Sequence, residues 1–198
     1  EIDALRFENE QTIAHILVKE GNVRMLKAAR DVGVNLGRPD RNGDTPSHMA
    51  ALQDYAQIIS VFSHADVNLE CTNKVGSTPL HYAAYGGNLE AVQVLIGSGV
   101  NLDKQENYGN TALHYAVMSE ATSIVEALVN AGASPDKENK LKGTPLHGAV
   151  EVKSSVITTI LLDAKAISHL KNNEGLTPLD MARRQSAQEI VLLLLNDA

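Results

Sequence analysis

The sequence repeats itself at a constant interval of 33 residues. Thr-Pro-x-His or a close variant begins at Thr45, Thr78, Thr111, Thr144 and Thr177, and successive threonines are 33 residues apart. One interval earlier, residues 12–15 read Thr-Ile-Ala-His, which keeps the threonine and the histidine but lacks the proline. A fixed period of this length predicts tandem supersecondary units that bury a core only by stacking on their neighbours.

Each unit carries the same helix signals. A turn signal with glycine precedes every Thr-Pro, the threonine hydroxyl can cap a helix, and proline suits the first helical position. In the third unit, Leu80, Ala83 and Ala84 share one helical face, a Gly-Gly-Asn break follows, and residues 89–96 carry a second apolar stripe. The pattern predicts helix, short loop, helix. Small residues that allow neighbouring first helices to approach closely recur at one offset: Ala50, Ala83, Ala116, Ala149 and Ala182.

These motifs resemble the ankyrin repeat family, whose 33-residue unit carries Thr-Pro-Leu-His-x-Ala. Residues 78–83 and 144–149 match this motif fully, while residues 111–114 lack the proline, residues 45–48 lack the leucine and residues 177–180 lack the histidine. The resemblance covers essentially the whole chain. It implies an all-α ankyrin-repeat solenoid of six stacked helix-loop-helix units with β-turn tips, forming a single domain over residues 1–198. The expected units are approximately 1–39, 40–72, 73–105, 106–138, 139–171 and 172–198.

The histidines favour a structural role over metal binding. Five of the seven stand at the repeat offset, so stacked neighbours should lie about 8–10 Å apart. Zinc–nitrogen bonds of about 2 Å cannot span that distance. The resemblance implies that these side chains hydrogen-bond backbone groups and tie adjacent turns together. They are His15, His48, His81, His114 and His147.

Composition and motifs argue against several function classes. There is no phosphate-binding loop, nucleophile elbow or Cys-x-x-Cys pair, so we expect no catalysis, no cofactor and no metal. The net charge of −7 argues against a nucleic-acid partner, and the longest apolar run, residues 190–195, is too short to span a membrane. The single cysteine, Cys71, favours a reducing compartment, which predicts a cytoplasmic or nuclear protein.

The resemblance implies a non-catalytic protein–protein interaction module that binds a protein or peptide on its concave surface. That surface consists of the turn tips and the exposed face of each first helix. The alternative is a substrate-recognition or regulatory ankyrin domain of a larger enzyme or channel. The candidate partner-binding residues are Arg41, Asn42, Asp44, Leu52, Gln53, Lys74, Val75, Tyr85, Asn107, Tyr108, Asn110, Met118, Lys140, Leu141, Glu151 and Val152.

Tyr85, Tyr108 and Met118 are expected to form an aromatic-rich patch in the middle of this surface, since central aromatic residues are frequent hot spots. The alternative is that Tyr85 packs on its own helix and Tyr108 only decorates a turn. Basic residues flank these positions and would suit an extended peptide with acidic ends: Arg41, Lys74, Lys137, Lys140 and Lys142.

Two places depart from the repeat. Leu192 stands at an offset that carries polar residues in the other units, so the last unit is too apolar for a terminal cap and further repeats or another domain are expected beyond Ala198. The fifth unit has Val152-Lys153-Ser154 where a glycine-rich helix break is expected, which predicts an irregular loop.

Overall fold

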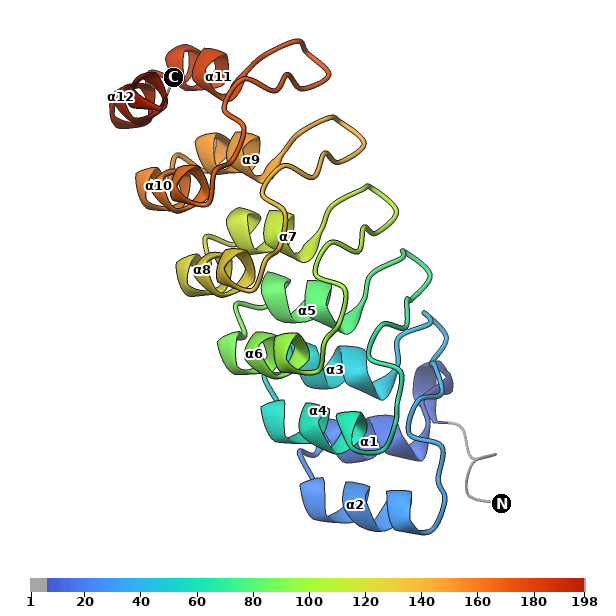
Figure 1. Ribbon diagram of the computed structural model, residues 1–198. Helices are drawn as coiled ribbons and strands as arrows, with labels where there is room; N and C mark the ends of the chain where they lie inside the picture. The colour runs from blue at the N-terminus through green and yellow to red at the C-terminus, as the bar shows by residue number, and fades with distance from the viewer. Residues whose placement is uncertain (1–6, 198) are drawn as a thin grey trace. The chain divides into compact units, whose positions relative to one another are not determined.

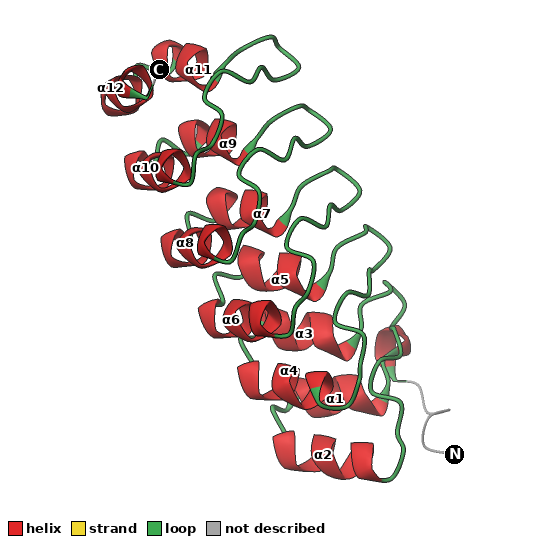
Figure 2. Ribbon diagram, viewed as in Figure 1, coloured by secondary structure: helices red, strands yellow, loops and turns green. Residues whose placement is uncertain are grey.

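A computed structural model describes residues 7–197, which divide between Asn101 and Leu102 into two compact units. We describe each unit by itself. Over the described range the chain forms helices and loops without any β-strand (Figure 2). This agrees with the all-α repeat architecture that the sequence predicts.

The first unit contains three helix pairs, and each pair corresponds to one sequence repeat (Figure 1). A short 3-10 helix, η2 (Glu8–Glu10), precedes the first pair. The pairs are α1 (Ile13–Lys19) with α2 (Val23–Asp31), α3 (Pro46–Leu52) with α4 (Ala56–Ser63), and α5 (Pro79–Tyr85) with α6 (Leu89–Gly97).

The second unit contains the remaining three pairs. They are α7 (Ala112–Met118) with α8 (Thr122–Asn130), α9 (Pro145–Glu151) with α10 (Ser155–Asp163), and α11 (Pro178–Arg184) with α12 (Gln188–Asn196). In every pair of the described chain the first helix has seven residues, while the second has eight or nine.

Stacking within each unit brings like helices together. In the first unit α3 packs between α1 and α5, and α4 packs between α2 and α6. In the second unit α9 lies between α7 and α11, and α10 lies between α8 and α12. The repeated alanines have no exposed surface, as expected for positions where neighbouring first helices meet: Ala50, Ala83, Ala116, Ala149 and Ala182.

Each first helix begins with a reciprocal capping box between the threonine and the residue three positions later. The backbone N–H of Thr45 donates to His48 Nδ1 over 3.1 Å, and the threonine Oγ1 lies 2.9 Å from the same nitrogen. The other four Thr-x-x-His pairs have the same geometry. Because Nδ1 accepts a backbone N–H, each ring is neutral and carries its proton on Nε2.

The Nε2 proton then joins one repeat to the next. His48 Nε2 donates to the backbone oxygen of Ser77 over 2.9 Å, and His147 Nε2 donates to that of Leu176 over 3.2 Å. His15 and His114 reach Asp44 and Gly143 in the same way. The structural role expected for these histidines is therefore confirmed. In the last repeat Asp180 Oδ2 accepts the Thr177 N–H over 3.1 Å, so a carboxylate takes the place of the imidazole in the capping box.

The loop of the fifth repeat is regular, contrary to the expectation from Val152-Lys153-Ser154. Lys153 adopts a left-handed conformation with φ of 56°, close to the 72° of Gly87 in the third repeat. Ser154 caps α10 by accepting the N–H of Ile157 over 3.2 Å. The prediction was wrong because a residue other than glycine can occupy one left-handed position when the surrounding helices hold it there.

Two of these histidines make stability depend on pH. Burial lowers the pKa of His48 and of His147 below the ordinary value of 6.5. The unfolded chain therefore binds more protons than the folded one between those lowered values and 6.5. We expect the free energy of unfolding to be fully present above about pH 6.5 and to fall as the pH is lowered to about 5.5. Urea unfolding at both pH values measures the change.

The control for this prediction replaces both titrating rings, as His48→Asn/His147→Asn. This variant is expected to be less stable than the wild type at neutral pH, and its stability should change less with pH because two proton-linked groups are gone. A pH dependence equal to that of the wild type would contradict the assignment.

Candidate partner-binding surface

The turn tips are held from inside by a side chain located five residues before the threonine. Asn139 Oδ1 accepts the backbone N–H of Leu141 over 2.9 Å and that of Gly143 over 3.0 Å. Sequence reasoning missed this position, although a polar residue recurs there at the repeat interval. The residues that close their own turns in this way are Asp40, Asn73, Glu106, Asn139 and Asn172.

Neighbouring tips within a unit are joined by one backbone hydrogen bond each. In the first unit Lys74 N donates to Asn42 O over 3.0 Å. In the second unit Lys140 N donates to Tyr108 O, and Asn173 N donates to Leu141 O, both over 2.9 Å. The candidate residues at the tips therefore project from a fixed backbone.

Two of the candidate partner-binding residues use their side chains to hold neighbouring tips together. Asp44 Oδ1 accepts hydrogen bonds from Asn73 Nδ2 over 2.8 Å and from the Tyr82 hydroxyl over 2.9 Å. Burial, together with the hydrogen bond to Asp44, raises the pKa of Tyr82, so that hydroxyl stays protonated and donates. Asn110 Oδ1 accepts from Asn139 Nδ2 over 2.9 Å. Asp44 and Asn110 are half-buried, and their side chains serve the scaffold.

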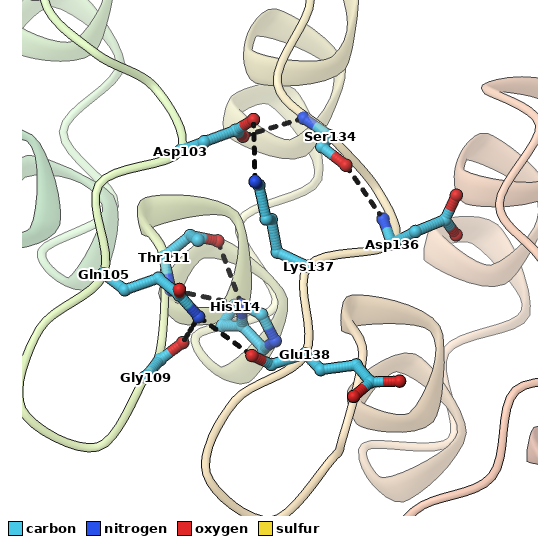
Figure 3. Close-up of polar contacts among 9 residues, drawn as sticks. All are labelled: Asp103, Gln105, Gly109, Thr111, His114, Ser134, Asp136, Lys137 and Glu138. Atoms are coloured by element: carbon cyan, nitrogen blue, oxygen red, sulfur yellow. Dashed lines mark hydrogen bonds and ion pairs between the residues drawn. The ribbon is translucent and has the colours of Figure 1, made fainter.

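The segments that lead to the tips are joined in the same manner (Figure 3). Asp103 Oδ1 accepts the Ser134 N–H over 2.9 Å, and Asp103 also lies 3.9 Å from the Lys137 ammonium. Gln105 Nε2 donates to the backbone oxygens of Gly109 and Glu138. Lys137, which the sequence placed beside the binding patch, is thus engaged with the neighbouring repeat.

Three acidic residues make the same kind of contact between neighbouring repeats, and we call them the acidic ladder. The carboxylate of each accepts a backbone N–H about one repeat later in the chain, at Asn101, Ser134 and Ile167 respectively. The acids of the ladder are spaced at the repeat interval, and that spacing was the one indication of their role in the sequence. They are Glu70, Asp103 and Asp136.

Most of the other candidates expose their side chains. In the first unit the exposed ones are Arg41, Asn42, Leu52, Gln53, Lys74, Val75 and Tyr85. In the second unit they are Asn107, Tyr108, Met118, Lys140, Leu141 and Glu151, whereas Val152 is half-buried.

The aromatic side chains lie open to solvent. Tyr85 is 63% exposed at the end of α5, and Tyr108 is 69% exposed at its tip. This exposure disfavours the alternative in which Tyr85 packs on its own helix. Tyr85 belongs to the first unit, and Tyr108 and Met118 belong to the second.

Residues 7–197 contain no group of three His, Cys, Asp or Glu side chains arranged to hold a metal ion. Cys71 Sγ lies 3.2 Å from Thr45 Oγ1, and burial raises the pKa of its thiol, which keeps it protonated at neutral pH. Among the helices of the described part, none has the length and apolar character needed to cross a membrane.

Comparisons with known proteins agree with this geometry. A model of ankyrin repeats in three copies matches residues 56–139 and again residues 122–198, which together make up more than half of the chain. The chain belongs to the ankyrin repeat family. It is similar in structure to the ankyrin repeat domain of Bcl-3, described as a unique member of the IkappaB protein family, with a TM-score of 0.88 and 25% identity over 96% of this chain and 88% of that one. No curated protein matches the sequence.

Tip packing can be tested at two glycines that occupy the same offset in their repeats. A Cβ atom at Gly109 (φ 82°) would lie 2.8 Å from the backbone nitrogen of Lys140, whereas one at Gly175 (φ 74°) would meet nothing within 4 Å. We expect Gly175→Ala to cost about 1 kcal/mol through left-handed strain alone. Gly109→Ala should cost at least about 1 kcal/mol more, because it also displaces the Lys140–Tyr108 hydrogen bond. Denaturant unfolding of both variants gives the difference, and equal losses would argue against the tip bond.

Proposed function

We propose that this chain is a non-catalytic interaction module that binds a protein or peptide through its turn tips and the C-terminal ends of its first helices. Ankyrin repeats in general are protein–protein interaction modules, and both the family match and the likeness to the Bcl-3 domain support a binding role. The observation that carries the proposal is the recurrence of exposed apolar side chains on a backbone fixed by hydrogen bonds.

Exposed apolar side chains recur at these positions. Three of the large exposed hydrophobic residues stand at tips, namely Val75, Tyr108 and Leu141, and three more end a first helix: Leu52, Tyr85 and Met118. Tyrosine and methionine are enriched at protein interfaces because they supply a large contact area. Since the tip backbone is already ordered, binding there loses little further conformational entropy.

The charge of the chain favours a protein over a nucleic acid as partner. Acidic residues outnumber basic ones by 24 to 17, whereas a nucleic-acid surface needs a continuous basic stripe. The unpaired cysteine supports action in the cytoplasm or nucleus.

The double variant Tyr85→Ala/Tyr108→Ala tests the surface. Both side chains are mostly exposed, so the melting temperature should be nearly unchanged. Affinity for a captured partner should fall by at least about tenfold, because each aromatic hot spot contributes roughly 2 kcal/mol or more. Affinity capture with wild type and variant, followed by titration of each captured protein, provides the measurement.

The matched control is Val156→Ala on α10, since Val156 is 58% exposed but lies on a second helix away from the tips. Partners that bind the proposed surface are retained by this control and released by the tyrosine variant. Partners that bind wild type, control and tyrosine variant with equal affinity would refute the proposed surface.

A further inference from the structure

The fifth repeat lacks a side chain at a position that is filled in every other repeat. The residue that follows the motif histidine, or Asp180 in the last repeat, is Gly148 here, and elsewhere it is Ile16, Met49, Tyr82, Tyr115 or Met181. Gly148 lies within α9, where glycine is unfavourable by about 1 kcal/mol relative to alanine. No positive φ requires it, since Gly148 is helical.

Gly148 lines an open groove of about 550 Å³ within the second unit. The groove lies between α7, α9 and α11, beneath the tip that carries Leu141. The apolar residues around Gly148 include Val117, Met118, Leu141 and Met181. Gly148 lies in the lining itself, and Val117 packs close to it, because a Cβ atom on Gly148 would lie only 3.3 Å from Val117 Cγ1.

A charged side chain at the groove is open to an occupant. Gln185, just after α11, also has an Oε1 atom without a hydrogen-bond partner among the described residues, but that atom is covered by its surroundings. Glu151 is exposed on α9 and forms no ion pair within residues 7–197. Arg184, the basic residue of the lining, pairs instead with Glu174 over 3.8 Å.

We propose that this groove is a specificity pocket for a protein segment that inserts one large apolar side chain over Gly148 and carries a lysine or arginine beside it. The apolar side chain replaces the one that the fifth repeat lacks. The neighbouring cation pairs with the exposed carboxylate of Glu151. The proposal rests on the proposed function, because it names the partner chemistry for one part of that surface.

The mixed character of the pocket explains its selectivity. An acidic neighbour would be repelled by Glu151, whereas a basic neighbour would be attracted to it. The best occupant therefore combines bulk and positive charge within two or three residues. The pocket therefore differs in charge preference from the tips of the first unit, where the basic residues Arg41 and Lys74 would favour an acidic segment.

The test uses short random peptides displayed on phage and selected on the whole chain. Enriched peptides should carry a large apolar residue next to lysine or arginine. Their affinity should fall at least about tenfold for Gly148→Met, since the methionine found at the same offset in the second and sixth repeats would fill the groove. For Glu151→Lys the enriched peptides should carry acidic neighbours instead.

Two controls keep folding separate from binding. Gly97→Met adds the same side chain at the end of α6, where a Cβ atom would meet nothing within 4 Å, and it should bind the peptides as the wild type does. The melting temperature of Glu151→Lys should stay close to that of the wild type, whereas Gly148→Met has to displace Val117, whose Cγ1 would lie 3.3 Å from the new Cβ atom. Glu151 is exposed, so its variant reports on charge preference even if Gly148→Met is destabilised.

The outcomes distinguish the pocket from the wider surface. Peptides that lose affinity for Tyr85→Ala/Tyr108→Ala but bind Gly148→Met normally would overturn the pocket and leave the proposed function standing. Peptides indifferent to all of these variants would overturn both, and a selection that enriches no sequence would overturn the pocket. Self-association of the wild type that Gly148→Met abolishes would assign the groove to a second copy of the chain and would also overturn the pocket.

Discussion

The neutral histidine of the Thr-x-x-His motif is the interaction on which the other features of each unit depend. Its Nδ1 closes the start of one first helix, and its Nε2 holds the backbone of the following turn. One buried ring therefore fixes both the conformation inside a repeat and the contact between repeats. Asp180 shows the limit of replacement, since a carboxylate can accept the threonine N–H but has no N–H of its own to donate onward.

A second set of polar contacts fixes the backbone of the turn tips. Each tip is closed by the residue five positions before the threonine, and adjacent tips share a backbone hydrogen bond. These contacts use mainly backbone atoms and inward-facing side chains. Some outward side chains also make contacts, such as Arg41, which lies 3.9 Å from Glu10, while Val75, Tyr108 and Leu141 are exposed. The same scaffold can therefore present tyrosine at one tip and leucine or valine at another without loss of packing.

Departures from the repeat are the informative positions, and they have different physical meanings. Lys153 takes a left-handed loop position that is glycine in the first and third repeats and a polar residue in the others, and the loop is unchanged because its neighbours hold that conformation. Glu106 replaces a shorter polar residue and still closes its tip through both carboxylate oxygens. Gly148 is different, because it leaves bare backbone in the lining of a groove at a position where the other repeats carry a side chain. Of these three departures, only Gly148 changes which side chains of a partner the surface can bind.

The 33-residue period alone determined the helix pairs, their caps and the buried alanines, because these follow from local capping rules and from which offsets repeat. The regular fifth loop, the ladder of Glu70, Asp103 and Asp136, and the engagement of Lys137 with Asp103 were not predictable in this way. Each depends on which atoms of successive repeats come within hydrogen-bonding distance. The groove lined by Gly148 was likewise decided by tertiary structure, since three stacked helices must come together before a groove exists between them.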